Sequence, residues 1–302
     1  MTVSDIQSYI AATGKDAYLY EENNFDRRME VTDFIGFQLM DRIEELLRST
    51  DQPATLMLLK SNAERLKSEL EGIDHRLFQR IQASVRTGVY TGKAFKTLVA
   101  EYVHLAPGHC GHQEEMGYDN LDIFINGLSL FQAMPEQTKD LEPEMVDYQK
   151  TPARAVFELV ELVRFREDDV FFDLGSGLGQ VAILVNILAG IPVIGVEFEP
   201  AFCDYARHCA AELNLTQVTF INADARKADY SAGTIFFMFT PFRGEILHEV
   251  LARLRAASLL RKITLITYGP CTALVAAQSW LHAATPESSD IYKIRVFSSR
   301  LT

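Results

Sequence analysis

The residues best suited to chemistry lie in a glycine-rich run that follows a short apolar segment. Asp173-Leu174-Gly175-Ser176-Gly177-Leu178-Gly179-Gln180 comes directly after Val170-Phe171-Phe172 and opens a helix predicted over residues 181–188. Glycines let a backbone turn sharply and approach a ligand without a Cβ clash. The amides at the start of the helix then face that ligand. A purely structural turn is the alternative interpretation.

Two acids downstream narrow the class of ligand. Glu197 ends the next apolar segment, 197 − 173 = 24 residues after Asp173, where a carboxylate can accept both hydroxyls of a ribose. Asp224 ends the segment after that and could accept from an adenine amino group, with Phe198 packed on the ring. The spacing is GxGxG, and Gln180 stands where a dinucleotide fingerprint has its third glycine, which disfavours NAD and FAD. These residues predict a pocket for an adenosine without a pyrophosphate.

Each acid also has a plainer interpretation. Glu197 could be an ordinary surface charge, and Asp224 could cap the next helix. Thr240 and Phe242 follow a strand at the edge where open α/β sheets bind ligands, but Phe242 could simply pack.

The three motifs resemble those of class I S-adenosylmethionine-dependent methyltransferases over about residues 150–300. The resemblance implies a Rossmann-like, mostly parallel sheet of six or seven strands with helices on both faces, and S-adenosyl-L-methionine as the cofactor. The cofactor-binding residues that we expect are Tyr148, Thr151, Asp173, Gly175, Ser176, Gly177, Gly179, Gln180, Glu197, Phe198, Asp224, Ala225 and Thr240.

Residues 170–181 are especially similar to the non-SET histone lysine methyltransferases, the disruptor-of-telomeric-silencing family. The resemblance gives Tyr148-Gln149-Lys150-Thr151 the part of that family's Tyr-x-x-Thr motif, at the methionine end of the cofactor; linker packing is the alternative for Tyr148. The chain departs from the family after the fourth strand, where Met238-Phe239-Thr240-Pro241-Phe242 replaces an asparagine pair. This segment matches the (Asn/Asp)-Pro-Pro-aromatic motif of amino-group methyltransferases incompletely.

The expected function is therefore methyl transfer to an unidentified acceptor, with a protein or peptide amino group such as lysine first. A small-molecule acceptor and a non-catalytic S-adenosylmethionine-binding module stay open, and a nucleotide-dependent oxidoreductase is disfavoured by Gln180. Tyr148, Thr240 and His109 are the candidates for a catalytic role. His109 lies in a segment, residues 104–115, with three histidines, a cysteine and two acids. Its spacing fits no known metal motif, so we expect a polar loop over the site and no metal.

The chain changes character near residue 150. Residues 1–147 are predicted to form an all-α domain, with helices over 33–47, 54–70, 74–85, 94–105 and 120–131 and an acidic linker over 135–147. This domain is expected to cap the cofactor cleft and build the acceptor pocket. Residues 148–302 are predicted to form the methyltransferase domain, where a helix that Thr151 caps precedes apolar strands at 170–172, 193–196, 218–221, 235–239, 263–267 and 291–297. Strands and helices that alternate in this way indicate a parallel sheet.

Composition excludes several classes of protein. The chain has 302 residues, 48% of them hydrophobic, which is enough for a large core and excludes a disordered or disulfide-stabilised chain. The net charge of −12 divides into −10 over residues 1–150 and −2 over 151–302, without a dense basic cluster, so we expect no nucleic acid as partner. Four cysteines without a CxxC pair, no evident signal peptide and no apolar stretch of membrane length predict a cytoplasmic protein without a membrane partner.

Overall fold

The computed structural model describes residues 1–50, 53–105, 117–129 and 133–300. Its contacts divide the chain into two compact units. The helical unit comprises residues 1–83 and 97–106, and the sheet unit comprises residues 84–96 and 107–302. The predicted domain boundary between residues 147 and 148 stays a prediction. It lies where the sequence pattern changes from helical to alternating, whereas the two units are defined by contacts.

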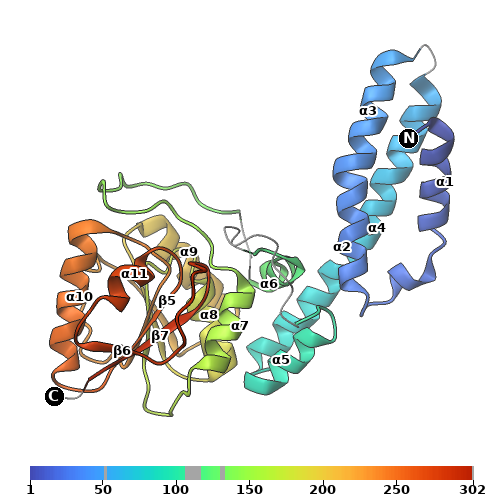
Figure 1. Ribbon diagram of the computed structural model, residues 1–302. Helices are drawn as coiled ribbons and strands as arrows, with labels where there is room; N and C mark the ends of the chain where they lie inside the picture. The colour runs from blue at the N-terminus through green and yellow to red at the C-terminus, as the bar shows by residue number, and fades with distance from the viewer. Residues whose placement is uncertain (51–52, 106–116, 130–132, 301–302) are drawn as a thin grey trace. The chain divides into compact units, whose positions relative to one another are not determined.

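The helical unit is built around one long helix (Figure 1). Ile35, Leu39 and Ile43 are buried in one apolar cluster with Leu59 and Leu66 of that helix. The chain is π-helical just before α3, within the helix predicted over 33–47, and Phe37 in this segment is 71% exposed. The elements are α1 (Val3–Thr13), η1 (Ala17–Tyr20), α2 (Phe25–Asp33), η2 (Phe34–Leu39), α3 (Met40–Ser49) and α4 (Pro53–Arg86), which replaces the two helices predicted over 54–85.

The sheet unit contains a seven-stranded sheet in the order β3-β2-β1-β4-β5-β7-β6. The first five of these strands are parallel, whereas β7 runs antiparallel to β5 and β6. This confirms the predicted, mostly parallel Rossmann-like sheet. The strands are β1 (Phe171–Leu174), β2 (Val193–Glu197), β3 (Val218–Asn222), β4 (Ile235–Met238), β5 (Thr264–Thr267), β6 (Leu281–Ala283) and β7 (Arg295–Ser299).

Helices cover both faces of this sheet (Figure 1). Phe172, Phe236 and Leu265 share a core cluster with α10 and α11, while α8 packs on β1 and β2 and contacts α7. Strand order reverses between β1 and β4, which neighbour each other across the sheet centre, and ligands of open α/β sheets bind at such a point beyond the carboxyl ends of the strands. The remaining helices of the chain are α5 (Gly92–Ala100), whose residues are divided between the two units, and α6 (Asn120–Ser129), α7 (Ala153–Leu162), α8 (Gln180–Ala189), α9 (Pro200–Glu212), α10 (Gly244–Ser258) and α11 (Cys271–Ala276).

The start of α7 differs from the predicted cap. Pro152 occupies the N-cap position, and no side chain of the helix itself caps it. Instead Asp122, on α6, accepts the hydrogen bond of the Ala153 N–H at 2.8 Å. A carboxylate 31 residues away thus replaces Thr151 as the cap. Within the described ranges, we find no helix that combines the length and the apolar character needed to cross a bilayer.

Candidate functional site

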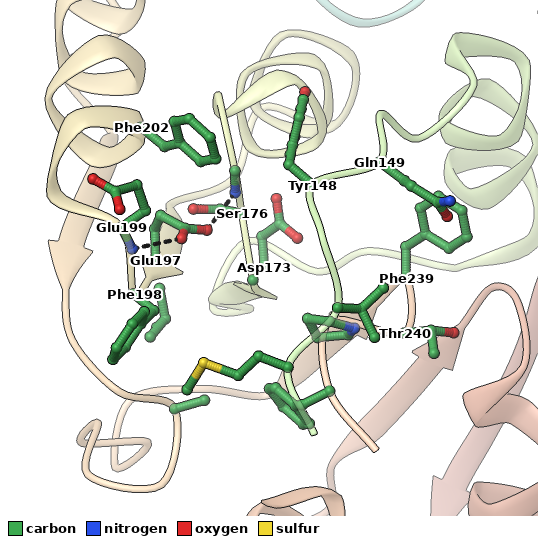
Figure 2. A pocket seen from close by; sticks show the side chains of 18 of the residues that line it. Tyr148, Gln149, Asp173, Ser176, Glu197, Phe198, Glu199, Phe202, Phe239 and Thr240 are labelled. Carbon is green, nitrogen blue, oxygen red and sulfur yellow. Dashed lines mark hydrogen bonds between the residues drawn. The ribbon is translucent and has the colours of Figure 1, made fainter. Parts of the chain in front are cut away.

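A pocket of about 1040 Å³, its open mouth included, lies at the carboxyl ends of β1, β2 and β4. Figure 2 shows it extending from Phe198 at one end to Phe239 and Thr240 at the other, with Asp173 between them. The predicted cofactor residues other than Gly179 all contribute to its wall. His109 lies outside the described residues.

The glycine-rich loop passes from β1 to α8 in the left-handed region of backbone space. Gly177 has a φ of +52°, and a Cβ built on it would lie 2.2 Å from Cε2 of Tyr148. Gly179 has a φ of +85°, and its Cβ would lie 2.6 Å from Cζ of Phe220. Gly177 therefore permits contact with the ring that covers the loop, whereas Gly179 permits the loop to pack on the sheet.

Glu197 joins two loops at the end of β2. Its Oε2 accepts the N–H of Gly177 at 2.7 Å, and its Oε1 accepts the N–H of Glu199 at 2.8 Å. The Asn222 amide, on the neighbouring strand, donates to the carbonyls of Glu197 and Phe198, each at 2.9 Å. Burial raises the pKa of Glu197 although these backbone N–H groups oppose the shift.

Asp173 is buried beneath the loop and points into the pocket between Glu197 and Tyr148 (Figure 2). Burial, and then the charge of Glu197, raises the pKa of Asp173 to about 8. A carboxyl group with such a pKa is ready to ionise against a cation, because an opposite charge offsets the cost of burial.

Unpartnered polar atoms gather in this pocket. Among the described residues, four buried side-chain polar atoms have no hydrogen-bond partner, and three of them are Oδ2 of Asp173, Oγ of Ser176 and Oε1 of Gln180. The side-chain amide nitrogen of Gln180 donates to the carbonyl of Thr151 at 3.0 Å, and this bond fixes the orientation of the amide. Because buried polar groups normally have partners, these atoms fit a ligand that brings its own hydroxyl and ammonium donors, as S-adenosylmethionine does.

The ionisable side chains that line the pocket, tyrosine aside, are all acidic. Its described lining contains five carboxylates and no lysine, arginine or histidine; the acids are Asp147, Asp173, Glu197, Glu199 and Asp224. A pyrophosphate would meet repulsion here, whereas a ligand with a sulfonium and an ammonium group would be attracted. The electrostatics thus agree with the glycine spacing in disfavouring a dinucleotide.

The residues predicted as a linker form part of the wall. We call residues 137–148 the strap, since several of them line the pocket. The buried Glu199 holds one end of the strap by accepting the Thr138 hydroxyl at 2.5 Å and the Lys139 N–H at 2.8 Å. Burial opposes ionisation of Glu199, but these hydrogen bonds outweigh it and lower its pKa.

The other end of the strap is attached to the start of α10. Oε2 of Glu144 accepts the N–H of Ile246 at 3.0 Å, and the Glu144 carbonyl accepts the N–H of Arg243 at 2.9 Å. Val146 then donates to the Pro241 carbonyl at 3.1 Å. Sequence reasoning missed this arrangement; the acids in the segment were the available signal, since carboxylates stabilise helix N-termini.

Thr240 adopts a strained backbone conformation at the end of β4. Its φ is +42°, which is unusual for a β-branched residue and is the kind of strain found at functional sites. Its hydroxyl donates to the Tyr268 carbonyl at 3.2 Å and accepts the N–H of Cys271 at 3.1 Å. These bonds place Thr240 as the residue that joins β4 to the start of α11.

Phe239 lines this end of the pocket, and two further rings pack behind it. The Phe239 ring lies 4.9 Å from that of Tyr268, which lies 5.7 Å from that of Tyr292, measured between centroids. On the opposite wall, Tyr148 packs 5.5 Å from Phe202, and burial raises the pKa of Tyr148 above its ordinary value. The Tyr148 hydroxyl therefore stays protonated at neutral pH.

The histidine-rich segment lies mostly outside the described residues. His104 belongs to the helical unit, where its N–H donates to Asp26 at 3.2 Å. In the part of the chain that the structure describes, no three His, Cys, Asp or Glu side chains converge as a metal ion would require.

Comparison with known proteins identifies the sheet. Residues 145–239 match the model of a family described as histone methylation protein DOT1. No curated protein matches the chain. Similar solved structures include an RNA methyltransferase from Salinibacter ruber in complex with S-adenosyl-L-homocysteine (22% identity, 50% of this chain and 92% of that chain, TM-score 0.38) and precorrin-6y C5,15-methyltransferase from Geobacter metallireducens (15% identity, 52% and 93%, TM-score 0.39).

The matched segment runs from the strap to the end of β4 and contains the glycine loop, Glu197 and Asp224. The family match, the strand order and the pocket agree with one another. The chain carries a class I S-adenosylmethionine-dependent methyltransferase domain, as the sequence motifs predicted, and S-adenosylmethionine is its cofactor.

Proposed function

We propose that this methyltransferase acts on an amino group of a protein or peptide, and on lysine in particular. The observation that carries the proposal is the acidic character of the pocket, whose described lining has five acidic side chains and no lysine, arginine or histidine. Residues 136–147, which include most of the strap, hold five acids and one lysine. Acidic side chains in and beside the pocket attract a basic peptide segment and repel a phosphodiester chain. The description of the matched family supports the same acceptor.

The cofactor is proposed to lie along the pocket with its adenine near Phe198. Glu197 would accept the ribose hydroxyls with the lone pairs that its two backbone N–H donors leave open. Asp173 would ionise against the cationic methionine end, where Tyr148 covers Gly177. This assignment gives Oδ2 of Asp173, one of the unpartnered atoms, a cationic partner.

The acceptor is proposed to enter at the end that Phe239 and Thr240 form. Phe239 lines this end and is backed by the buried ring of Tyr268, so it offers aromatic surface on which an ammonium group or its alkyl chain packs favourably. The prediction that residues before 148 help to build the acceptor side gains support from the strap, because residues 137–147 contribute to the wall.

The chemistry follows from positioning. When bound, S-adenosylmethionine supplies a methyl group on a sulfonium, and an amine attacks it in line. The chain orients both partners, which removes an entropic barrier. A protonated amine has no lone pair, so its proton must leave before attack. Tyr148 cannot take that proton near neutral pH because its own pKa is raised; we propose that the proton leaves through the open mouth to water.

Binding and transfer should be measured separately. Isothermal titration with S-adenosylhomocysteine, sinefungin and NAD tests the cofactor, and we expect the first two to bind with micromolar affinity and NAD not to bind. Radiolabelled S-adenosylmethionine with a lysine-rich peptide and with the same peptide in which arginine replaces each lysine tests the acceptor. We expect label in the lysine peptide alone.

Other results would point elsewhere. Label in small amines but not in the lysine peptide would indicate a small-molecule enzyme, and label in RNA would contradict the acceptor proposal. Binding of S-adenosylhomocysteine without transfer to any acceptor would indicate a non-catalytic module. We also propose a cytoplasmic location, which the buried side chains of Cys203, Cys209 and Cys271, none of them in a disulfide, suit.

A further inference from the structure

Arg226 connects two carboxylates that come from separate segments of the sheet unit. Its Nε lies 3.0 Å from each carboxylate oxygen of Asp224, and its terminal nitrogen donates to Oδ2 of Asp224 at 2.7 Å. The same terminal nitrogen donates to Oε1 of Glu142 at 2.5 Å. Asp224 follows β3, whereas Glu142 lies in the strap. One guanidinium therefore joins the adenine-side loop to the strap.

This pairing restricts the carboxylate of Asp224. Oδ1 also accepts the main-chain N–H of Arg226 at 2.8 Å, so the plane of the carboxylate is fixed by donors on one side. A planar guanidinium imposes such an orientation, which the point charge of a lysine does not. The Asp224 side chain is 12% exposed and contributes to the pocket wall. The carboxylate edge that remains open is thus aimed by Arg226.

We infer that Arg226 is a positioning residue for the cofactor, which aims Asp224 at the adenine amino group and couples that contact to the strap through Glu142. The inference rests on the proposed function in that the ligand is an adenosyl compound. Arg226 itself is absent from the pocket wall, so it acts through its two partners.

A purely structural ion pair would behave differently. If Arg226 only stabilised the loop, its loss would weaken every ligand of the pocket by the same factor. If Arg226 aims Asp224, its loss weakens a ligand that has the 6-amino group more than one that lacks it. Only the amino group depends on a well-oriented carboxylate as its hydrogen-bond acceptor. The ratio of two affinities therefore separates the roles.

The probes are S-adenosylhomocysteine and S-inosylhomocysteine, in which a carbonyl oxygen replaces the amino group. We expect the wild-type protein to prefer the first by about 100-fold, and Arg226→Ala and Arg226→Lys to reduce that preference by about tenfold, since a charged hydrogen bond contributes on this order. Arg207→Ala is the matched control. Arg207 lies on α9 and donates to the carbonyl of Phe220 in β3, the strand that Asp224 follows. It is not part of the pocket wall, so its loss should leave the preference unchanged.

The coupling to the strap has its own readout. Glu142→Gln should speed the dissociation of S-adenosylhomocysteine about fivefold, whereas Asp140→Asn, an isosteric change of another exposed acid in the strap, should not. Combined with Arg226→Ala, Glu142→Gln should add no further effect, because both changes break one network.

Each remaining result decides against the inference. Equal weakening of both probes in Arg226→Ala would reduce Arg226 to a structural ion pair, and tighter binding of S-adenosylhomocysteine would show that Arg226 competes with adenine for Asp224. Additive effects of Arg226→Ala and Glu142→Gln would refute the coupling. If the wild-type protein binds neither probe, the proposed function fails together with the inference, whereas normal wild-type binding with an unchanged ratio in the variants defeats the inference alone.

Discussion

Oε2 of Glu197 accepts the N–H of Gly177 at 2.7 Å, and this bond ties the end of β2 to the loop that follows β1. The second oxygen of Glu197 accepts from Glu199, at the start of α9. One carboxylate thus fixes two loops at the place where the sheet binds ligands. A substitution of Glu197 should therefore change both the ribose contact and the positions of the two loops.

Glu197→Gln should weaken S-adenosylhomocysteine by about tenfold or more. An amide has one acceptor oxygen, so its NH₂ must face either a backbone N–H or the ribose, and an unmet buried donor costs about 1–3 kcal/mol. Isothermal titration measures the affinity, and thermal unfolding without ligand measures the cost to the loops. Glu136→Gln, at an exposed acid outside the pocket wall, is the control; equal affinities in the two variants would contradict the role of Glu197.

Gly177→Ala should abolish measurable cofactor binding while Gly190→Ala leaves it intact. Both glycines have positive φ, of +52° and +70°, so each substitution incurs about 1–2 kcal/mol of backbone strain. The new Cβ meets Tyr148 at position 177 but nothing within 4 Å at position 190. Comparison of stability and affinity in the two variants separates strain from contact. Equal affinity in both would show that the Tyr148 contact does not matter.

The sequence predicted the sheet because its signals are local. Apolar strands and the glycine spacing are short patterns. Five of the strands and the whole glycine loop lie where expected, whereas the last strand, predicted over 291–297, is shifted to β7 (Arg295–Ser299). The short β6 was missed, since Leu281–Ala283 has one buried residue and two exposed ones and carries no apolar run. The continuous α4 was missed because Gly72 and Ile73 interrupt the pattern without ending the helix.

Long-range contacts explain the other differences. The cap of α7 comes from Asp122 and not from Thr151, and no spacing rule links residues 31 positions apart. The strap was taken for a linker because extended chain held by Glu199 and Glu144 leaves no periodic signal. The ion pair of Arg226 with Glu142, 84 positions away, is invisible in the sequence for the same reason.

Cofactor affinity should rise with pH up to about pH 8. Burial holds the pKa of Asp173 near 8 in the folded protein, and its ordinary value is 3.8. A cationic ligand favours the ionised carboxylate, so binding below pH 8 must release a proton, and affinity should rise by up to about tenfold per pH unit. Titration of S-adenosylmethionine, which carries the sulfonium charge, at pH 6, 7 and 8 in buffers of different ionisation enthalpy measures both the affinity and the number of protons released.

The ligand-free protein should show the opposite trend. Between about pH 4 and 8 the folded state keeps the proton of Asp173 and the unfolded state does not, so stability falls as pH rises across this window and levels off above it. Asp173→Asn carries no titrating group, and its melting temperature should fall less between pH 6 and 8 than that of the wild type. Parallel melting curves in the two proteins would mean that Asp173 is already ionised.

Tyr148→Phe should retain both cofactor binding and methyl transfer, within about threefold of wild type. The structure assigns contacts to the ring, which covers Gly177 and packs 5.5 Å from Phe202, whereas the raised pKa of the hydroxyl prevents it from serving as a base near neutral pH. Tyr148→Ala removes the ring and should weaken S-adenosylhomocysteine more than tenfold, because the glycine loop then loses the aromatic surface that covers Gly177.

The division between kcat and affinity identifies which part of Tyr148 acts. Phe202→Leu should resemble a mild form of Tyr148→Ala, since it loosens the same ring from the opposite side. A Tyr148→Phe variant with normal affinity but a kcat reduced 100-fold would place the hydroxyl in the chemical step. The proton of the acceptor would then pass through Tyr148 and not directly to water, and the pH profile of kcat in the wild type would carry the titration of that hydroxyl.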